Sequence, residues 1–188
     1  IEAIPQWAPL WLHYDPVSSE FASRLGPQSV TCLATGGRTL QRACSEVQAG
    51  LAGMLPRGAE ASTISLSIID AVDDAWPPTP ERELFRLEAR RCASGGALHC
   101  FRISAGTERG LLYGAFRFLH LLRTEDEELL TMDMDISTAP SIQLRMWNLW
   151  DNVDGTIERG YAGKSIFNWT ALPALHARYT DYARLLAS

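Results

Sequence analysis

The chain has 188 residues, of which 46% are hydrophobic and 21% are charged, and its formal net charge is −5. This is the composition of an ordinary soluble globular protein, long enough for one domain with a sizeable core or for one domain and the beginning of another. The acidic balance argues against a nucleic-acid partner, which normally meets a basic face. No apolar run approaches the ~20 residues that span a bilayer, so we expect no membrane partner.

The first third of the chain alternates between strand and helix patterns. Residues 1–17 hold three prolines and two tryptophans, which predicts an extended entry segment. Polar and apolar residues alternate at 29–34 and again at 64–69, as in strands with one buried face. Between them, residues 39–55 place apolar side chains at intervals of three and four, which predicts an amphipathic helix lying on a core.

Residues 73–80 contain three prolines, which remove donors from the backbone and predict a surface loop. Asp73 and Asp74 could form an acid pair or a metal site. Beside three prolines we expect them to be solvated loop carboxylates.

The middle of the chain predicts a hairpin followed by a helix. Residues 85–90 and 98–103 flank a glycine turn and alternate as strands with one wet face. Thr107 can cap a helix that continues to Leu122. Its expected buried stripe comprises Leu111, Leu112, Ala115, Phe116, Leu119 and Leu122, with His120 on the helix surface.

After this helix, the acidic residues 125–128 predict a solvated turn, with no reason to invoke calcium. Residues 132–136 predict one more strand, and 137–141 are the best linker candidate. Up to about residue 140 the pattern therefore predicts an α/β sandwich with helices on one face of a sheet.

Four cysteines, Cys32, Cys44, Cys92 and Cys100, lack any Cys-x-x-Cys or Cys/His cluster, so we expect no structural zinc and no other metal. Cys92 and Cys100 flank the hairpin turn and could face one another. Two disulfides and four free buried thiols both remain open.

The most informative stretch is Arg145–Ser165, which gathers aromatics, amides, carboxylates and cations in 21 residues. Alternation through 142–147 predicts a strand, and the turn-forming residues after Leu149 predict that it ends in a loop. Trp150 can pack against the C–H face of a pyranose while Asp151 and Asn152 bond its hydroxyls. The alternative is a structural clamp within the loop.

This block resembles the start of the catalytic barrel in glycoside hydrolase family 67, the α-glucuronidases that remove glucuronic acid or its 4-O-methyl ether from xylan fragments. The Trp-Asp-Asn motif at 150–152 and the Glu-Arg-Gly-Tyr-Ala-Gly motif at 158–163 are the most specific part. Further segments resemble the family in the same order along the chain: Trp11–Val17, Arg109–Phe116, Trp169–Pro173 and Arg178–Ser188.

The resemblance implies two parts: a two-layer α/β sandwich over residues 1–140, and the first strand, loop and helix of a (β/α)8 barrel, or TIM barrel, over 141–188. A barrel needs ~250 residues, and 48 follow residue 140. We therefore expect a fragment or truncated product of a longer enzyme.

The implied activity is hydrolysis of α-1,2-linked (4-O-methyl)glucuronic acid from xylan-derived oligosaccharides with inversion. The family supplies the acid and base from later barrel strands, so no residue here is assigned as catalytic, and no cofactor is expected. The isolated chain should be inactive.

The resemblance assigns sugar binding to the rim of the first barrel strand. Trp150 would pack against the glucuronyl ring, with amides and a carboxylate around it and a charged pair holding or lining the loop: Asn148, Asp151, Asn152, Glu158 and Arg159. Leu149 stands where many relatives carry His, so any polar contact made there is absent.

The expected partners are xylooligosaccharides that bear glucuronic acid, and the full-length enzyme could form a homodimer. We expect an extracellular, secreted enzyme whose signal peptide is not in this chain, because residues 1–17 lack a basic start and an apolar core; a cytoplasmic enzyme is the alternative. Two other functions stay open: a noncatalytic α/β carbohydrate-binding or scaffold domain, and the accessory domain of another glycosidase.

Overall fold

The computed structural model describes residues 14–26, 28–32, 36–56, 62–68, 79–90, 100–131, 133–142, 144–148, 152, 165 and 167–188. They divide into two compact units, a larger one of Tyr14–Leu144 and a smaller one that includes Arg145–Ser188.

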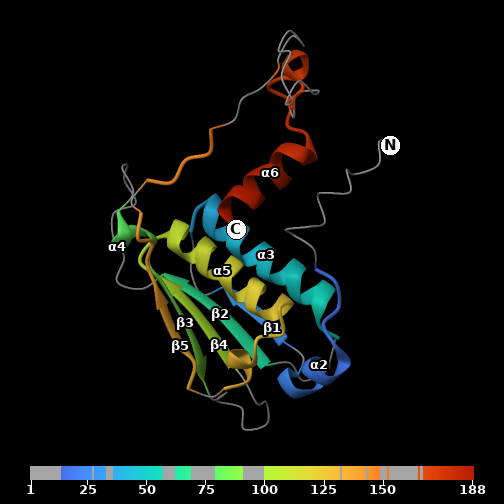
Figure 1. Cartoon of the computed structure of the whole chain (residues 1–188), viewed down its shortest axis with the longest axis vertical. Coiled ribbons are helices and arrows are strands. Elements are labelled where there is room, and N and C mark those ends of the chain that lie inside the picture. The colour runs from blue at the N-terminus through green and yellow to red at the C-terminus, as the bar shows by residue number, and fades with distance from the viewer. Residues whose placement is uncertain are drawn as a thin grey trace. The chain divides into compact units, whose positions relative to one another are not determined.

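The larger unit is built on an open sheet of five strands in the order β1-β2-β4-β3-β5 (Figure 1). β1 pairs in parallel with β2, and β2 pairs in parallel with β4, whereas β3 runs antiparallel to both β4 and β5. The strands are β1 (Gln28–Cys32), β2 (Ser62–Ile68), β3 (Phe85–Arg90), β4 (Cys100–Ala105) and β5 (Asp135–Thr138). All five segments predicted as strands up to residue 136, hairpin included, thus contribute to one mixed sheet.

Two helices, α3 (Arg38–Met54) and α5 (Glu108–Arg123), lie side by side over the sheet (Figure 1). The strands point apolar side chains at them: Ile64 pairs with Phe101, and Leu87 with Ile103, and all four are almost completely buried. Hydroxyl and charged side chains occupy the alternate positions, as expected for the other face of a sheet. The predicted packing of helices against a sheet is confirmed.

α5 is buried more widely than a single stripe predicts. Phe118 and Leu121 are buried in addition to Leu111, Ala115, Phe116, Leu119 and Leu122, whereas Leu112 is only partly buried. The reason is that α5 packs against both the sheet and α3. Gly114 permits the approach to the sheet, because a Cβ there would lie 2.7 Å from Cγ2 of Ile103.

The acidic turn after α5 is largely exposed, as its composition predicts, and in addition makes contacts that the composition does not predict. Glu125 accepts hydrogen bonds from the amide and hydroxyl of Ser18 at 2.7 and 2.6 Å, and Glu127 binds both terminal nitrogens of Arg24. Ser18 caps α2 (Ser19–Leu25), and Glu127 begins the 3-10 helix η1 (Glu127–Leu130). The turn therefore anchors α2 to the end of the helical layer.

The cysteines of the described residues are all in disulfides, which settles the open alternative in favour of disulfides at these positions. Cys32 at the end of β1 is bonded to Cys44 in α3, and Cys100 is also disulfide-bonded. Cys92, expected opposite Cys100, lies outside the described residues, as does most of the proline loop 73–80. Pro80 begins the short helix α4 (Pro80–Glu83).

The smaller unit contains the 3-10 helix η2 (Trp169–Ala171) and the helix α6 (Ala177–Ala187), which confirms the helix predicted at 178–186. The strand predicted over 142–147 was wrong for the residues described: Ile142 lies in a bend and 144–148 are coil. Alternation alone does not make a strand, because the backbone also needs a neighbouring strand to complete its hydrogen bonds, and no described strand pairs with this segment.

Within the described ranges, no helix combines the length and the apolar character needed to cross a membrane.

Candidate functional site

Two of the six predicted sugar-binding residues are described. Asn148 is exposed at the end of the coil 144–148. Asn152 is only 7% exposed. Trp150, Asp151, Glu158 and Arg159 lie outside the described residues, so their grouping around a sugar stays a prediction.

The coil that leads to this site exposes large apolar side chains. Leu144 is 44% exposed, Met146 82% and Trp147 69%. Adjacent exposed apolar side chains of this size indicate a place where another protein surface packs.

The buried carboxylates of the larger unit are engaged in structural pairs. Glu46 accepts a hydrogen bond from the Tyr14 hydroxyl at 3.1 Å and lies 3.5 Å from Arg42. Glu88 lies 2.7 Å from Arg90. These contacts give both carboxylates partners within the fold, which is a structural role.

Glu83, in α4, is the third buried carboxylate of this unit, and its Oε1 lies 3.8 Å from Nη1 of Arg109 in α5. The pair joins two neighbouring elements and therefore also has a structural role.

Three further carboxyl groups of the described residues have shifted pKa values, and all three shifts are downward. A hydrogen bond with its own backbone and one with the Thr79 side chain lower the pKa of Glu81. Hydrogen bonds from Ser18 hold the pKa of the Glu125 carboxyl below its usual value. The Arg86 guanidinium, which hydrogen-bonds Asp135 at 2.7 Å, lowers the pKa of that carboxyl. A general acid in glycoside hydrolysis needs a raised pKa, so all three groups are unsuited to that role.

Among the described residues, no three His, Cys, Asp or Glu side chains lie close enough together to bind a metal ion.

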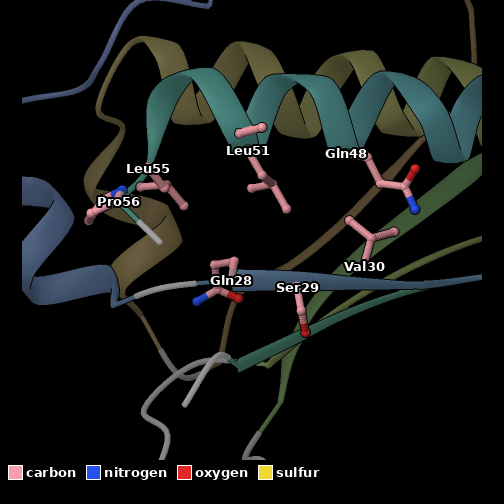
Figure 2. Close-up of a pocket in the computed structure, with 8 residues that line it drawn as sticks. Gln28, Ser29, Val30, Gln48, Leu51, Leu55 and Pro56 are labelled. Atoms are coloured by element: carbon pink, nitrogen blue, oxygen red, sulfur yellow. The ribbon is translucent and has the colours of Figure 1, made fainter. Parts of the chain in front are cut away.

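A groove of about 220 Å³ lies between the edge strand β1 and the last turns of α3 (Figure 2). Its lining mixes amides and a hydroxyl with apolar side chains: Gln28, Ser29, Val30, Gln48, Leu51, Ala52, Leu55 and Pro56. None of these side chains titrates near neutral pH and none is aromatic. The groove therefore offers no acid, base or stacking surface for hydrolysis of a glycoside.

A cluster of aromatic rings in the smaller unit was not predicted from the sequence. Phe167 contacts Trp169 and Tyr179, with ring centroids 5.5 and 5.2 Å away. Tyr182 meets Phe167 edge-on at 6.5 Å. The spacing of Tyr179 and Tyr182, three residues apart on one helix face, was the available indication.

Comparison with known proteins identifies the family. Residues 124–188 match the sequence profile of the glycosyl hydrolase family 67 middle domain. Over 193 residues, covering 95% of the chain, it is 34% identical to the probable alpha-glucuronidase A of Aspergillus terreus. The chain belongs to glycoside hydrolase family 67.

Other relatives agree with this family 67 assignment. The probable alpha-glucuronidase A of Aspergillus clavatus is 34% identical over 194 residues, and the alpha-glucuronidase A of Aspergillus tubingensis is 29% identical over 187 residues. In both comparisons the alignment covers 95% of the chain and 22% of the relative. The chain thus spans about a fifth of the length of these relatives.

The family 67 profile begins at Thr124, directly after α5, and runs through the smaller unit. All six predicted sugar-binding residues lie within this matched stretch.

Proposed function

We propose that the chain is the amino-terminal part of an α-glucuronidase that hydrolyses α-1,2-linked glucuronic acid, or its 4-O-methyl ether, from xylan-derived oligosaccharides with inversion. The observation that carries this proposal is the alignment of 95% of the chain with proteins named alpha-glucuronidase A. The continuity of that match across both compact units makes a shared accessory domain alone a poorer explanation.

In this proposal residues 141–188 begin a (β/α)8 barrel, and the boundary with the accessory domain falls near residue 140. The alternating residues 142–147 would become the first barrel strand once neighbouring strands pair with them. The exposure of Leu144 and Met146 supports this, because a barrel strand buries such side chains. α6 then corresponds to the first barrel helix.

The glucuronyl ring would be bound at the end of that strand. Trp150 would pack against the sugar, and Asn148, Asp151 and Asn152 would bond its hydroxyls, with Glu158 and Arg159 holding or lining the loop. The exposed position of Asn148, directly before this loop, is consistent with a role at a rim. Carboxyl ends of barrel strands are where such enzymes place their active sites.

The acid and the base would come from later strands of the complete barrel, held roughly 6.5–9.5 Å apart so that a water fits between base and sugar. Support comes from the buried carboxylates of the larger unit, which are paired within the fold. We therefore assign no catalytic residue to this chain, and propose no cofactor.

We further propose an extracellular enzyme. The disulfide between Cys32 and Cys44 supports this, because such bonds persist in oxidising compartments and are rare in the cytosol. A homodimer of the complete enzyme also stays a prediction.

The alternative, a noncatalytic carbohydrate-binding or scaffold domain, is favoured by one observation. Residues 14–144 bury a continuous hydrophobic core of their own beneath α3 and α5. Such a unit is able to fold without a barrel.

Hydrolysis assays on aldouronic acids distinguish the two functions. The polypeptide encoded by the complete gene should release glucuronic acid, initially as the β-anomer by proton NMR, whereas the 188-residue chain should release none. Trp150→Ala in the complete enzyme should remove most activity, whereas Arg117→Ala, at an exposed position of α5, is the control and should retain it. A complete polypeptide that folds but releases no glucuronic acid would refute the proposed hydrolysis.

A further inference from the structure

Trp169 presents an indole that is held in place and yet open to solvent. It begins η2 and is 45% exposed. Its indole nitrogen donates a hydrogen bond to the hydroxyl of Ser165 at 3.1 Å. The polar edge of the ring is therefore satisfied within the protein, and the remaining exposed surface is mainly apolar ring.

Neighbouring aromatic rings pack against this indole. Phe167 lies between Trp169 and α6, with its ring tilted 57° from the indole and 45° from the Tyr179 ring. The backbone amide of Asn168 donates to the Tyr179 hydroxyl at 2.6 Å, which fastens the loop to α6. An aromatic side chain fixed in this way loses little conformational freedom when a ligand binds.

The loop that carries the indole is polar but has no charged side chain in its sequence. No Asp, Glu, Lys or Arg occurs between Ser165 and His176. Asn168 and Thr170, on either side of Trp169, are both exposed. The Thr170 hydroxyl donates to the Asn168 carboxamide oxygen at 2.8 Å, which leaves the carboxamide N–H groups as donors.

We propose that Trp169 is a stacking platform for a neutral pyranose, a xylose unit of the oligosaccharide. This rests on the proposed function and adds a contact to the xylan backbone, separate from the glucuronyl contact assigned to Trp150. A ring face with adjacent amide and hydroxyl groups matches the alternating C–H and O–H surface of a sugar. The absence of charged side chains along the loop favours xylose over a uronate.

The competing occupant is an apolar protein surface of the complete enzyme, since Leu172 and Leu175 are also exposed, at 42% and 84%. An apolar protein surface packed on Trp169 would also cover the exposed polar side chains of Asn168 and Thr170. Burial of polar groups costs free energy unless they find new partners, which argues against this occupant.

Isothermal titration of the 188-residue chain with xylotriose, which carries no glucuronic acid, tests the proposal. Trp169→Ala should weaken binding by about tenfold or more, equivalent to about 1.4 kcal/mol. Trp169→Phe should retain part of the affinity. Trp147→Ala is the matched control, because Trp147 is exposed in the same unit, and should leave the dissociation constant unchanged.

A second measurement guards against misfolding of the alanine variant. In a ¹H–¹⁵N spectrum the indole N–H of Trp169, assigned from its loss in Trp169→Phe, should shift on addition of xylotriose. Ser165→Ala should weaken binding while leaving the circular dichroism of the chain unchanged.

Absence of heat and of any indole shift up to the solubility limit of xylotriose would overturn the proposal, and so would equal losses in Trp169→Ala and Trp147→Ala. Neither result affects the proposed hydrolysis. That is judged from glucuronic acid release by the complete enzyme and its dependence on Trp150.

Discussion

At the scale of single residues, Gly53 determines how the segment before α2 meets α3. A Cβ at position 53 would lie inside contact distance of the Tyr14 carbonyl oxygen and 2.9 Å from the Tyr14 Cβ. The same segment donates a backbone hydrogen bond from Val17 to Met54 and carries the bond from Tyr14 to Glu46. Gly53 therefore permits this segment to approach α3 closely enough to form both hydrogen bonds.

We expect Gly53→Ala to destabilise the chain by about 1–2 kcal/mol, because the segment must move away from the helix. Helix propensity alone predicts the opposite sign, a gain of about 1 kcal/mol for Ala over Gly. Urea unfolding followed by circular dichroism decides between the two. Ala49→Gly, at an exposed position of the same helix, is the control and should cost about 1 kcal/mol from propensity alone.

Glu125 predicts a specific pH dependence. Its pKa is lowered from the ordinary value of 4.5 by hydrogen bonds from Ser18, so the unfolded chain binds this proton more readily than the folded chain. The stabilisation from Glu125 is fully present above about pH 4.5 and is lost as the pH falls through the lowered folded value.

Comparison of wild type with Glu125→Gln by urea unfolding should therefore show the larger difference at pH 7 and a smaller one at pH 3.5. Glu128→Gln is the control, since the Glu128 side chain is exposed. A difference between wild type and Glu125→Gln that does not change with pH would mean that the Ser18 contact does not depend on the ionised carboxylate.

At the scale of elements, one covalent link joins the edge strand β1 to the helical layer. The bond between Cys32 and Cys44 closes a loop of 12 residues in sequence separation. Replacement of both cysteines by serine should lower the free energy of unfolding by about 2–4 kcal/mol, because the unfolded chain regains the freedom that the link removes. Differential scanning calorimetry of both forms would measure the loss, and an unchanged melting temperature would argue against this link.

The helices and most strands were predictable from the sequence, because a regular spacing of apolar residues indicates the face of an element that packs against a neighbouring surface. The stripe at 39–55 and the capping threonine at 107 place α3 and α5 within one residue of their observed starts. The buried positions Phe118 and Leu121 were missed because α5 packs against two neighbours, the sheet, where Phe118 contacts Phe101 of β4, and α3, so that more than one stripe is buried. The spacing of apolar residues does not show how many neighbouring elements bury a helix.

The segment 142–147 shows the limit of the same argument. Its alternation is as regular as that of β2, yet 144–148 form coil, because a strand also needs a paired neighbour that local sequence does not specify. The acidic turn shows a related limit, since its partners Ser18 and Arg24 lie about 100 positions away. For the candidate site, the sequence motifs predicted the position of the sugar-binding loop. The packing of aromatic rings around Phe167 could be seen only in the structure.

At the scale of the whole molecule, the proposed boundary near residue 140 makes the coil 144–148 the expected point of first cleavage. Leu144, Met146 and Trp147 are exposed there, and exposed coil is more readily bound by proteases than paired strands. Chymotrypsin in limiting amounts should therefore cut in this coil before it cuts the sheet.

The amino-terminal fragment should keep the far-ultraviolet circular dichroism of α3 and α5 and unfold cooperatively, because the larger unit holds a continuous core of its own. Mass spectrometry of the first products identifies the site of cleavage. Trp147→Ser is the control, because it removes one chymotrypsin cleavage site from the coil and leaves the hydrophobic core unchanged. This substitution should slow the first cleavage. First cleavage between residues 85 and 138 would place the weak point inside the sheet and contradict the proposed boundary.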